Sequence, residues 1–456
     1  MFANSFKDSA AGHRAPAGPP GYPIVGHLPH FLRDRLGFLS RCAREYGEVV
    51  KLRIGSPTYL LTSPADIKHV LVMNAENYDK TPRLISKMGK RLSGEGLMTH
   101  SGPTHLRQRR LLQPIFYRRA VEIHGDTVVQ NTERMLETWP TDTPLDINPE
   151  LITVARGNMI QSLFGAGYRD EGGRFAEALM TRRRYIQYWL TSPFPPEYLP
   201  VGRTRGYRLA EKVIDQSLLA AVQRARAAMT PSEGLLSRLV GARYEDGTAM
   251  TDHQICGEAL TLATTGYETI AAALGWTCYL ISQHPQVEAK IRLELAAVLN
   301  GDRPSGEHVP RLRYTWSVLS ESMRLYPPTW MFVRIARAED RLPSGADIPA
   351  GTKIFLCQYV MHRHPRYFPQ PGVFDPERFS DAAKEGRPQF AYFPFGGGPR
   401  VCIGEGFAKM ESVLVLACLL RRFRFELVPG QAMEPAPEIN LRPRNGTVMQ
   451  LHRCQT

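Results

Sequence analysis

The stretch FPFGGGPRVCIGEGF, residues 393–407, contains five glycines, two prolines and a single cysteine. Glycine and proline both disfavour the interior of helices and strands, so the sequence predicts an irregular loop here. A helix is expected directly after the loop, over residues 404–422, because apolar residues recur there at spacings of three and four. The many glycines indicate that a large, flat ligand lies close against the backbone.

Cys402 therefore stands at the start of a predicted helix. The positive end of the helix dipole and the free backbone N–H groups at that end both favour a thiolate over a thiol. A thiolate acts as a nucleophile or as a metal ligand, and a nucleophile normally needs a nearby base. The loop contains no histidine, and it lacks the Gly-Lys-Ser/Thr ending of a phosphate-binding loop. These features favour a thiolate bound to a haem iron.

The full spacing Phe395-x-x-Gly398-x-Arg400-x-Cys402-x-Gly404 closely resembles the haem-binding signature of the cytochrome P450 family. The resemblance is to the soluble, bacterial-type haem-thiolate monooxygenases. It implies haem b with Cys402 as the axial thiolate ligand, and O2 as the co-substrate. It also implies that Arg400 pairs with a haem propionate and that Phe395 packs beside the sulfur. Gly398 and Gly404 would let the backbone pass close to the porphyrin.

A long helix is predicted over residues 250–285, where Thr251 and Gln254 form a capping box and Pro285 marks the end. Such a helix is longer than average, so we expect it to cross the whole domain. Its apolar middle is interrupted by Thr264, Thr265, Gly266, Glu268 and Thr269. A local explanation is that the threonines bond to carbonyls of their own helix and that the glutamate is solvated.

The segment TTGYET, residues 264–269, resembles the A/G-G-x-D/E-T oxygen-activation motif of the same family. The resemblance implies that Thr269 hydrogen-bonds the oxygen that the haem activates and that Glu268 helps to relay protons. Gly266 would leave room for a ligand. Thr265 departs from the motif, in which alanine or glycine is usual, and adds a second hydroxyl.

Two further sets of residues match the family. Glu321 and Arg324 are spaced i,i+3, a spacing that alone usually means a weak surface ion pair. Together with Arg378 in FDPERF they resemble the structural Glu-Arg-Arg triad of the family. Haem propionates need arginine or histidine donors. The matching residues are His105, Arg109 and Arg334, in addition to Arg400.

The composition limits the remaining function classes. The 456 residues are 43% apolar and 22% charged, and the net charge is +13. The positive charge could serve nucleic acid, an anionic membrane surface or an acidic protein partner; no nucleic-acid-binding motif stands out, which disfavours nucleic acid and leaves an acidic partner open. Seven cysteines without a C-x-x-C pair argue against disulfides and zinc, and most are expected to be small buried side chains. No signal peptide or transmembrane anchor is expected, so the sequence predicts a cytoplasmic protein, expected to be a monomer.

The predicted fold class is mainly α with small β-sheets (α+β), as the resemblance over residues 16–453 also implies. A proline- and glycine-rich lead-in is expected over residues 1–30, and a single haem-thiolate monooxygenase domain over residues 31–456. Hairpins are predicted at residues 49–64 and 439–453.

The resemblance implies a separate electron donor, an acidic ferredoxin or flavodoxin. Its docking residues are predicted to be Arg107, Arg110, Lys409, Arg421 and Arg422. The substrate pocket is predicted to include Ala263, Thr264, Thr329, Met331 and Phe332, with an aromatic lid over residues 185–194.

These mostly apolar side chains suit a hydrophobic small molecule that is hydroxylated or epoxidised, and a fatty acid, terpenoid, polyketide or steroid all stay open. A peroxide-driven or rearranging haem-thiolate enzyme and a haem-based gas sensor are alternatives. The acid and alcohol of Glu268 and Thr269 argue against both.

Overall fold

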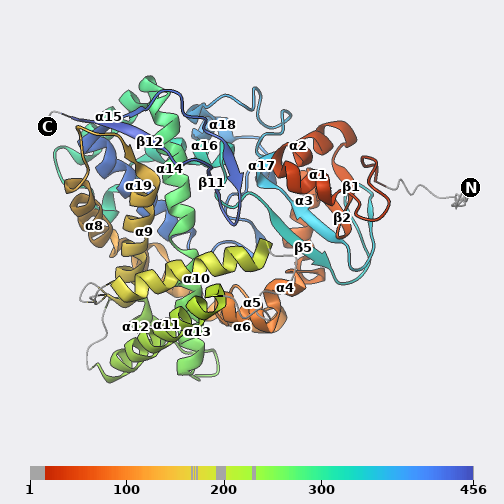
Figure 1. Cartoon of the computed structure of the whole chain (residues 1–456), viewed down its shortest axis with the longest axis horizontal. Coiled ribbons are helices and arrows are strands. Elements are labelled where there is room, and N and C mark those ends of the chain that lie inside the picture. Colours follow the sequence, from red (N-terminus) through yellow and green to blue (C-terminus); the bar gives the residue numbers. More distant parts are fainter. Residues whose placement is uncertain are drawn as a thin grey trace, which may run out of the picture. The chain divides into compact units, whose positions relative to one another are not determined.

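The computed structural model describes residues 16–165, 168, 170, 173–191, 202–228 and 233–454. Half of the predicted lead-in and the end of the predicted lid therefore lie outside the described residues. Helices dominate the described chain, and its strands form small sheets (Figure 1), as predicted. The chain divides into two compact units, each described below by itself.

The first unit comprises Met1–Thr81, Met331–Pro371 and Arg387–Val401, and is built on a sheet of order β1-β2-β8-β5-β3. Buried and exposed residues alternate along β1, because successive side chains point to opposite faces of a sheet. The antiparallel pairing of β1 with β2 around Gly55 confirms the predicted first hairpin. The elements of this unit are β1 Val49–Ile54, β2 Ser56–Leu61, β3 Tyr78–Asp79, β5 Phe332–Ala336, β6 Asp340–Arg341, β7 Asp347–Ile348, β8 Lys353–Leu356, α1 Leu28–Arg33, α2 Arg35–Tyr46, α3 Pro64–Lys68 and α17 Gln358–Met361.

The second unit comprises Pro82–Trp330, Gly372–Gly386 and Cys402–Thr456, and is mostly helical. Helix α14 packs against α9, α16 and α19 and so lies at the centre of its largest apolar core (Figure 1). Its helices are α4 Pro82–Ile85, α5 Lys87–Ser93, α6 Gly102–Leu112, α7 Arg118–Glu122, α8 Gly125–Glu137, α9 Ile147–Phe164, α10 Arg174–Thr191, α11 Gly202–Ala227, α12 Leu235–Gly241, α13 Asp252–Thr265, α14 Glu268–Ser282, α15 Pro285–Leu299, α16 Arg313–Leu325, α18 Asp381–Lys384 and α19 Glu405–Arg422. Its strands are β4 Leu145–Asp146, β9 Phe423–Leu427, β10 Pro435–Pro437, β11 Leu441–Pro443 and β12 Val448–Arg453.

Two predicted elements differ in the structure. The long helix is two helices, α13 and α14, which are separated by Gly266 and Tyr267. The predicted capping box of Thr251 and Gln254 is confirmed. The predicted C-terminal hairpin is wrong in its pairing, because β11 pairs with β10 while β12 pairs with β9 and β4. Both strands exist, but each buries its apolar side chains against a different earlier strand.

The predicted aromatic lid is also wrong for its described part. Tyr185 and Trp189 of α10 are only 3% and 4% exposed. They pack in an aromatic cluster with Leu92 and Tyr207. These two side chains therefore pack against the protein interior rather than forming a cover.

Candidate active site

The glycine-rich loop is held in the first unit by backbone contacts. Gly396 and Gly398 have positive φ values of 78° and 66°, which glycine adopts without strain. A Cβ on Gly398 would overlap the carbonyl oxygen of Leu71, so no other residue fits there. A Cβ on Gly396 would approach the ring of Phe332 to 3.2 Å. Two of the loop glycines are thus explained by close packing within this unit.

Cys402 lies in the second unit, three residues before Glu405, where α19 begins, within one residue of the predicted start. It is the only exposed cysteine of the seven, all of which are described and free. Cys42, Cys278, Cys357 and Cys418 are buried, as expected for small apolar side chains. Cys256 and Cys454 are half-buried, so Cys402 is the most accessible of the seven cysteines.

The surroundings of Cys402 favour the thiolate less than the sequence predicts. Burial of the sulfur among protein atoms raises the pKa of Cys402, although the residue has an exposed surface. The Gly404 N–H and the Arg109 guanidinium lower the pKa, as the helix-start argument requires, but Glu405 raises it. A bound cation would reverse this balance, because a metal ion is the largest local charge in such a site.

The first unit holds a cluster of basic side chains around Asp79. Asp79 pairs with Arg400 at 3.5 Å and with Arg337 at 2.6 Å. Burial, Arg400 and Arg334 lower the pKa of Lys80 to about 7. Burial and Arg400 likewise lower the pKa of Arg334 to about 10. Burial is the largest cause of both shifts, and the neighbouring guanidinium groups add to it while Asp79 opposes it.

Lys80 was missed by the sequence reasoning. It follows strand β3, which pairs with β5 so that Asp79 lies opposite Ile335, beside Arg334. The pairing joins residues far apart in the chain, and nothing local in NYDK signals it. Arg334 and Arg400, in contrast, were predicted and the structure places both in this cluster.

His105 and Arg109 lie on α6 in the second unit, at the predicted i,i+4 spacing. His105 is 4% exposed. The Arg109 Nε donates a hydrogen bond to the Gln113 Oε1 at 2.8 Å. Burial lowers the pKa of Arg109 and the charge of Cys402 raises it, so these two residues share one electrostatic environment.

Glu268 at the start of α14 is not solvated. Its side chain is 10% exposed and pairs with Arg183 of α10. The Asn440 Nδ2 donates to its Oε2 at 3.0 Å, and the Tyr267 hydroxyl donates to its Oε1 at 3.3 Å. Burial raises the pKa of Glu268 while Arg183, Tyr267 and Asn440 oppose that rise. Neither Arg183 nor Asn440 was predicted, because both come from distant segments.

The threonines at the junction of α13 and α14 follow the local explanation in part. The Thr265 hydroxyl donates to the Thr261 carbonyl at 2.8 Å, and the Thr269 hydroxyl to the Thr265 carbonyl at 3.4 Å. The Thr264 hydroxyl oxygen is buried without a hydrogen-bond partner among the described residues. A buried polar atom of this kind suits a bound molecule.

Gly266 has a different explanation from the predicted one. A Cβ at Gly266 would overlap the Met159 side chain and lie 2.9 Å from the Leu262 carbonyl oxygen. The space at this face of the glycine is therefore filled by α9 rather than left for a ligand. Its N–H still bonds the Leu262 carbonyl at 3.0 Å, so the helical path continues up to the junction.

The structure brings the predicted triad together. Arg324 donates to both oxygens of Glu321, at 2.6 and 2.7 Å, and both side chains are 0% exposed. The Arg378 Nε lies 3.5 Å from the Glu321 Oε1. The Asp375 N–H donates to that same oxygen at 3.0 Å. The cluster ties α16 to the segment that contains Arg378.

The predicted pocket residues are divided between the units. Ala263 is fully buried in an apolar cluster and Thr329 is half-buried, both in the second unit. Met331 and Phe332 are half-buried in the first unit. Ala263 is explained by core packing.

Residues 16–450 match the protein family described as Cytochrome P450, and the chain belongs to this family. It is therefore a haem enzyme with a cysteine thiolate ligand, a monooxygenase that uses O2. Members of this family take electrons from a redox partner and bind hydrophobic substrates. Among the described residues, no helix is both long and apolar enough to cross a membrane.

Similar proteins agree with this assignment over nearly the whole chain. Cyclooctatin synthase of Streptomyces melanosporofaciens is 32% identical over 94% of this chain and 94% of its own. Pentalenene oxygenase of Streptomyces avermitilis is 30% identical over 92% of this chain and 93% of its own. The retinoic acid-bound cyanobacterial CYP120A1 matches with a TM-score of 0.86 at 25% identity, over 97% of this chain and 100% of that chain.

The described residues fit a haem. A haem carries two carboxylates and an iron, and the chain offers a cluster of basic side chains and one exposed thiol. The glycines whose side chains are excluded by packing lie directly before that thiol.

Proposed function

We propose that this enzyme hydroxylates a terpenoid and that Cys402 is the thiolate ligand of its haem. The observation that carries the assignment is that Cys402 alone among the cysteines is exposed, directly before α19. The terpenoid class is supported by cyclooctat-9-en-7-ol 5-monooxygenase and pentalenene oxygenase, the terpenoid-modifying relatives. Hydroxylation and epoxidation differ only in the bond that the oxygen attacks.

We assign the haem carboxylates to the basic side chains of Arg334, Arg400, His105 and Arg109. Lys80 is added to this set because Arg400 and Arg334 lie close enough to lower its pKa. Phe395 is proposed to cover the sulfur, and Gly398 and Gly404 to let the backbone approach.

The haem, when bound, supplies the binding and activation of O2. The chain would supply protons through Glu268 and Thr269, with Gly266 and Thr265 at the same junction. Because burial raises the pKa of Glu268, its carboxyl group holds a proton at a higher pH than an ordinary glutamate. Arg183 binds one carboxyl oxygen and Asn440 binds the other, so together they orient the carboxyl group. To pass its proton on, Glu268 would have to exchange one of these partners for the group that receives the proton.

The substrate pocket is proposed to include Ala263, Thr264, Thr329, Met331 and Phe332. The unpaired Thr264 hydroxyl would give a single polar contact in otherwise apolar surroundings. The triad of Glu321, Arg324 and Arg378 is proposed to be structural, since its two central side chains have no exposed surface.

We propose that an acidic ferredoxin or flavodoxin delivers the electrons at the start of α19. Lys409 and Arg118 line a cavity of about 250 Å³ there, and Lys384 adds to the positive charge at Lys409. Arg107 and Arg110 are weaker candidates, because Asp246 and Glu245 pair with them at 2.7 and 3.4 Å.

Arg421 was also predicted as a docking residue, but it lies at the far end of α19 and donates to the Asp302 carbonyl at 2.9 Å. We therefore leave it out of the proposed docking surface and use it as the matched comparison. Lys409→Gln should slow reduction and weaken its salt dependence, while Arg421→Gln should change neither. A reduction rate that is flat in salt for the unmodified enzyme would remove the docking proposal.

The haem ligand is tested by the spectrum of the reduced, CO-bound protein. The unmodified enzyme should absorb near the position typical of thiolate ligation, and Cys402→Ala should lose this band while keeping its helical content by circular dichroism. Cys454→Ala, at a half-buried cysteine, is the matched control and should keep the band. Retention of the band in Cys402→Ala would refute the ligand assignment.

The substrate class is tested by a screen of ligands that shift the haem spectrum, followed by turnover with a ferredoxin system. Terpenoids should give shifts and oxygenated products. If fatty acids give both and terpenoids neither, the terpenoid assignment fails while the monooxygenase class stands.

A further inference from the structure

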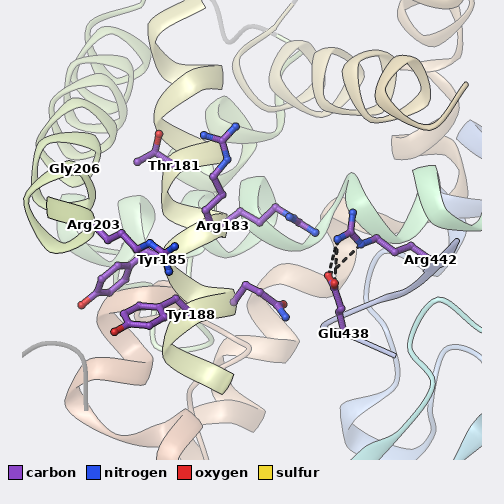
Figure 2. A pocket seen from close by; sticks show the side chains of 10 residues that line it. Thr181, Arg183, Tyr185, Tyr188, Arg203, Gly206, Glu438 and Arg442 are labelled. Carbon is purple, nitrogen blue, oxygen red and sulfur yellow. Dashed lines mark hydrogen bonds and ion pairs between the residues drawn. The ribbon is translucent and has the colours of Figure 1, made fainter. Parts of the chain in front are cut away.

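A second cavity of the helical unit has a different chemistry from an apolar substrate pocket. Its volume is about 490 Å³, within the range of small-molecule sites. It is lined by residues of α10 and α11 and of the hairpin formed by β10 and β11 (Figure 2). The lining residues are Thr181, Arg183, Arg184, Tyr185, Gln187, Tyr188, Arg203, Gly206, Glu438 and Arg442.

Helix α10 gives this cavity one of its faces. Thr181, Arg184, Tyr185 and Tyr188 are spaced i, i+3, i+4 and i+7, so they lie on the same side of the helix. Arg182, on the same helix, points away from the cavity. It is 1% exposed and donates a hydrogen bond to the Leu92 carbonyl at 3.0 Å. Arg182 and Arg184 therefore differ in function: Arg182 is part of the protein interior, and Arg184 lines the cavity.

The wall of the cavity is made rigid by stacked aromatic rings. Tyr185 stacks on Tyr207 of α11 with ring centroids 4.3 Å apart and an interplanar angle of 12°. Tyr188 packs edge-on against Tyr185 at 6.3 Å. The Arg203 guanidinium lies 5.2 Å from the centre of the Tyr188 ring, and Figure 2 shows it reaching from α11 toward α10. These rings offer apolar contact next to positive charge.

The cavity carries more arginine than carboxylate. Arg442 is neutralised by Glu438, which accepts two hydrogen bonds at 3.0 Å, and Figure 2 shows this pair on one side. Arg183 is neutralised by Glu268. Arg184 and Arg203 have no ion-pair partner in the described part of the chain. Two positive charges thus remain for whatever occupies the cavity.

We propose that this cavity binds a small amphipathic molecule by its anionic head group, a carboxylate or a phosphate, through Arg184 and Arg203. Arginine suits both head groups, because its planar guanidinium donates two parallel hydrogen bonds to either. The Tyr185 and Tyr188 rings would contact the apolar part of the ligand. A volume of about 490 Å³ admits one such molecule and excludes a macromolecule. This site does not depend on the haem ligand or on the terpenoid assignment.

The test compares ligands with the same chain and different head groups on the haem-loaded enzyme. Farnesoate, farnesyl monophosphate and the neutral farnesol are titrated by calorimetry in the absence of reductant, so that no turnover occurs. At least one anion should bind about tenfold tighter than farnesol, as charge-assisted hydrogen bonds predict. The preference should shrink as salt is raised.

Arg184→Gln/Arg203→Gln should abolish the preference for the anions and leave farnesol binding unchanged. Arg174→Gln/Arg205→Gln is the matched control: all four arginines are exposed on the same two helices, but Arg174 and Arg205 do not line the cavity. That control should keep the preference. A preference for only one anion would support the proposal and identify the head group.

Equal affinities for all three ligands would overturn the proposal. So would a loss of the preference in the control variant equal to that in the cavity variant, which would show that the effect is one of general charge. Because the measurement records heat and not product, its failure leaves the assignments of Cys402 and of the substrate class untouched.

Discussion

The helical unit contains two glutamate–arginine pairs that differ in sequence separation and in surroundings. Glu321 and Arg324 lie on one helix and are both 0% exposed. Glu268 and Arg183 join two helices, and their side chains are 10% and 21% exposed. The first pair is sealed within protein, whereas the second lies at the α13–α14 junction and its arginine borders a cavity.

The partners of the two glutamates explain what each pair can do. Glu321 also accepts the Asp375 N–H and lies near Arg378, so its oxygens are fixed by one rigid segment. Glu268 is held by Arg183, Tyr267 and Asn440, which come from different elements. Burial raises the pKa of both carboxyl groups. Only Glu268 combines a raised pKa with access to other partners, which a proton carrier needs.

The largest expected effect comes from breaking the sealed pair. Arg324→Met leaves the Glu321 carboxylate buried without its main partner, which should cost about 3–5 kcal/mol of unfolding free energy. Urea unfolding followed by circular dichroism measures this loss.

The control for Arg324→Met is Lys290→Met, which breaks a pair with Glu377 in which both side chains are 55% exposed. Its cost should be at most about 1 kcal/mol. The double variant Glu321→Leu/Arg324→Met should recover part of the loss, because no unpaired charge is left. Equal costs for the two single variants would contradict the distinction drawn between sealed and exposed pairs.

Breaking the second pair should affect turnover more than stability. Glu268→Gln keeps the shape of the side chain and removes the proton, so O2-dependent product formation should fall by about two orders of magnitude. Activity supported by hydrogen peroxide, which brings its own protons and electrons, should fall much less. The measurement is product formed per haem under both conditions.

Glu438→Gln is the matched control for Glu268→Gln, since it also removes a carboxylate from an arginine pair beside the same cavity. It should leave O2-dependent turnover nearly unchanged. A parallel loss of peroxide-supported activity in Glu268→Gln would argue for a packing defect and against a proton carrier.

The sequence predicts those parts of the site whose residues lie close together in the chain. The loop before Cys402, the α6 spacing of His105 and Arg109, and the i,i+3 pair in α16 each lie within one short segment. Helix α19 and the β1–β2 hairpin are local for the same reason.

What the sequence could not reveal depends on contacts between distant segments. Lys80 joins the cation cluster only because β3 pairs with β5. Glu268 is paired only because Arg183 and Asn440 reach it from other elements. The break between α13 and α14 arises where Gly266 meets Met159 of α9, and the apolar pattern runs through it without a signal.

A third buried glutamate differs from both, because it has no cationic partner in the described part of the chain. Glu411 of α19 is 0% exposed, and its only hydrogen bond among the described residues comes from the Asn158 Nδ2 at 2.9 Å. Burial raises the pKa of Glu411 from 4.5 to about 8. Below about pH 4.5 the folded and unfolded chains both hold this proton, and between the two pKa values only the folded chain does.

The unfolding free energy contributed by Glu411 should therefore fall as the pH rises from about 5 to about 8, by on the order of 2–3 kcal/mol. Glu411→Gln should remove this part of the pH dependence and stabilise the protein at the upper end. Urea unfolding of both proteins across this pH range measures the effect. Identical pH profiles would mean that Glu411 is not buried as a neutral acid.

The smallest effect is expected at Thr265, three residues before Glu268. The family resemblance suggested a second catalytic hydroxyl there, but the hydroxyl donates to the Thr261 carbonyl at 2.8 Å and the residue is exposed. Thr265→Ala should change O2-dependent turnover by less than about twofold and raise the unfolding free energy by a few tenths of a kcal/mol, because alanine has the higher helix propensity. Thr269→Ala, at the proposed oxygen-activating hydroxyl, should lose most of its turnover under the same conditions. Similar turnover in the two variants would contradict the assignment of a catalytic role to Thr269 and of a merely structural role to Thr265.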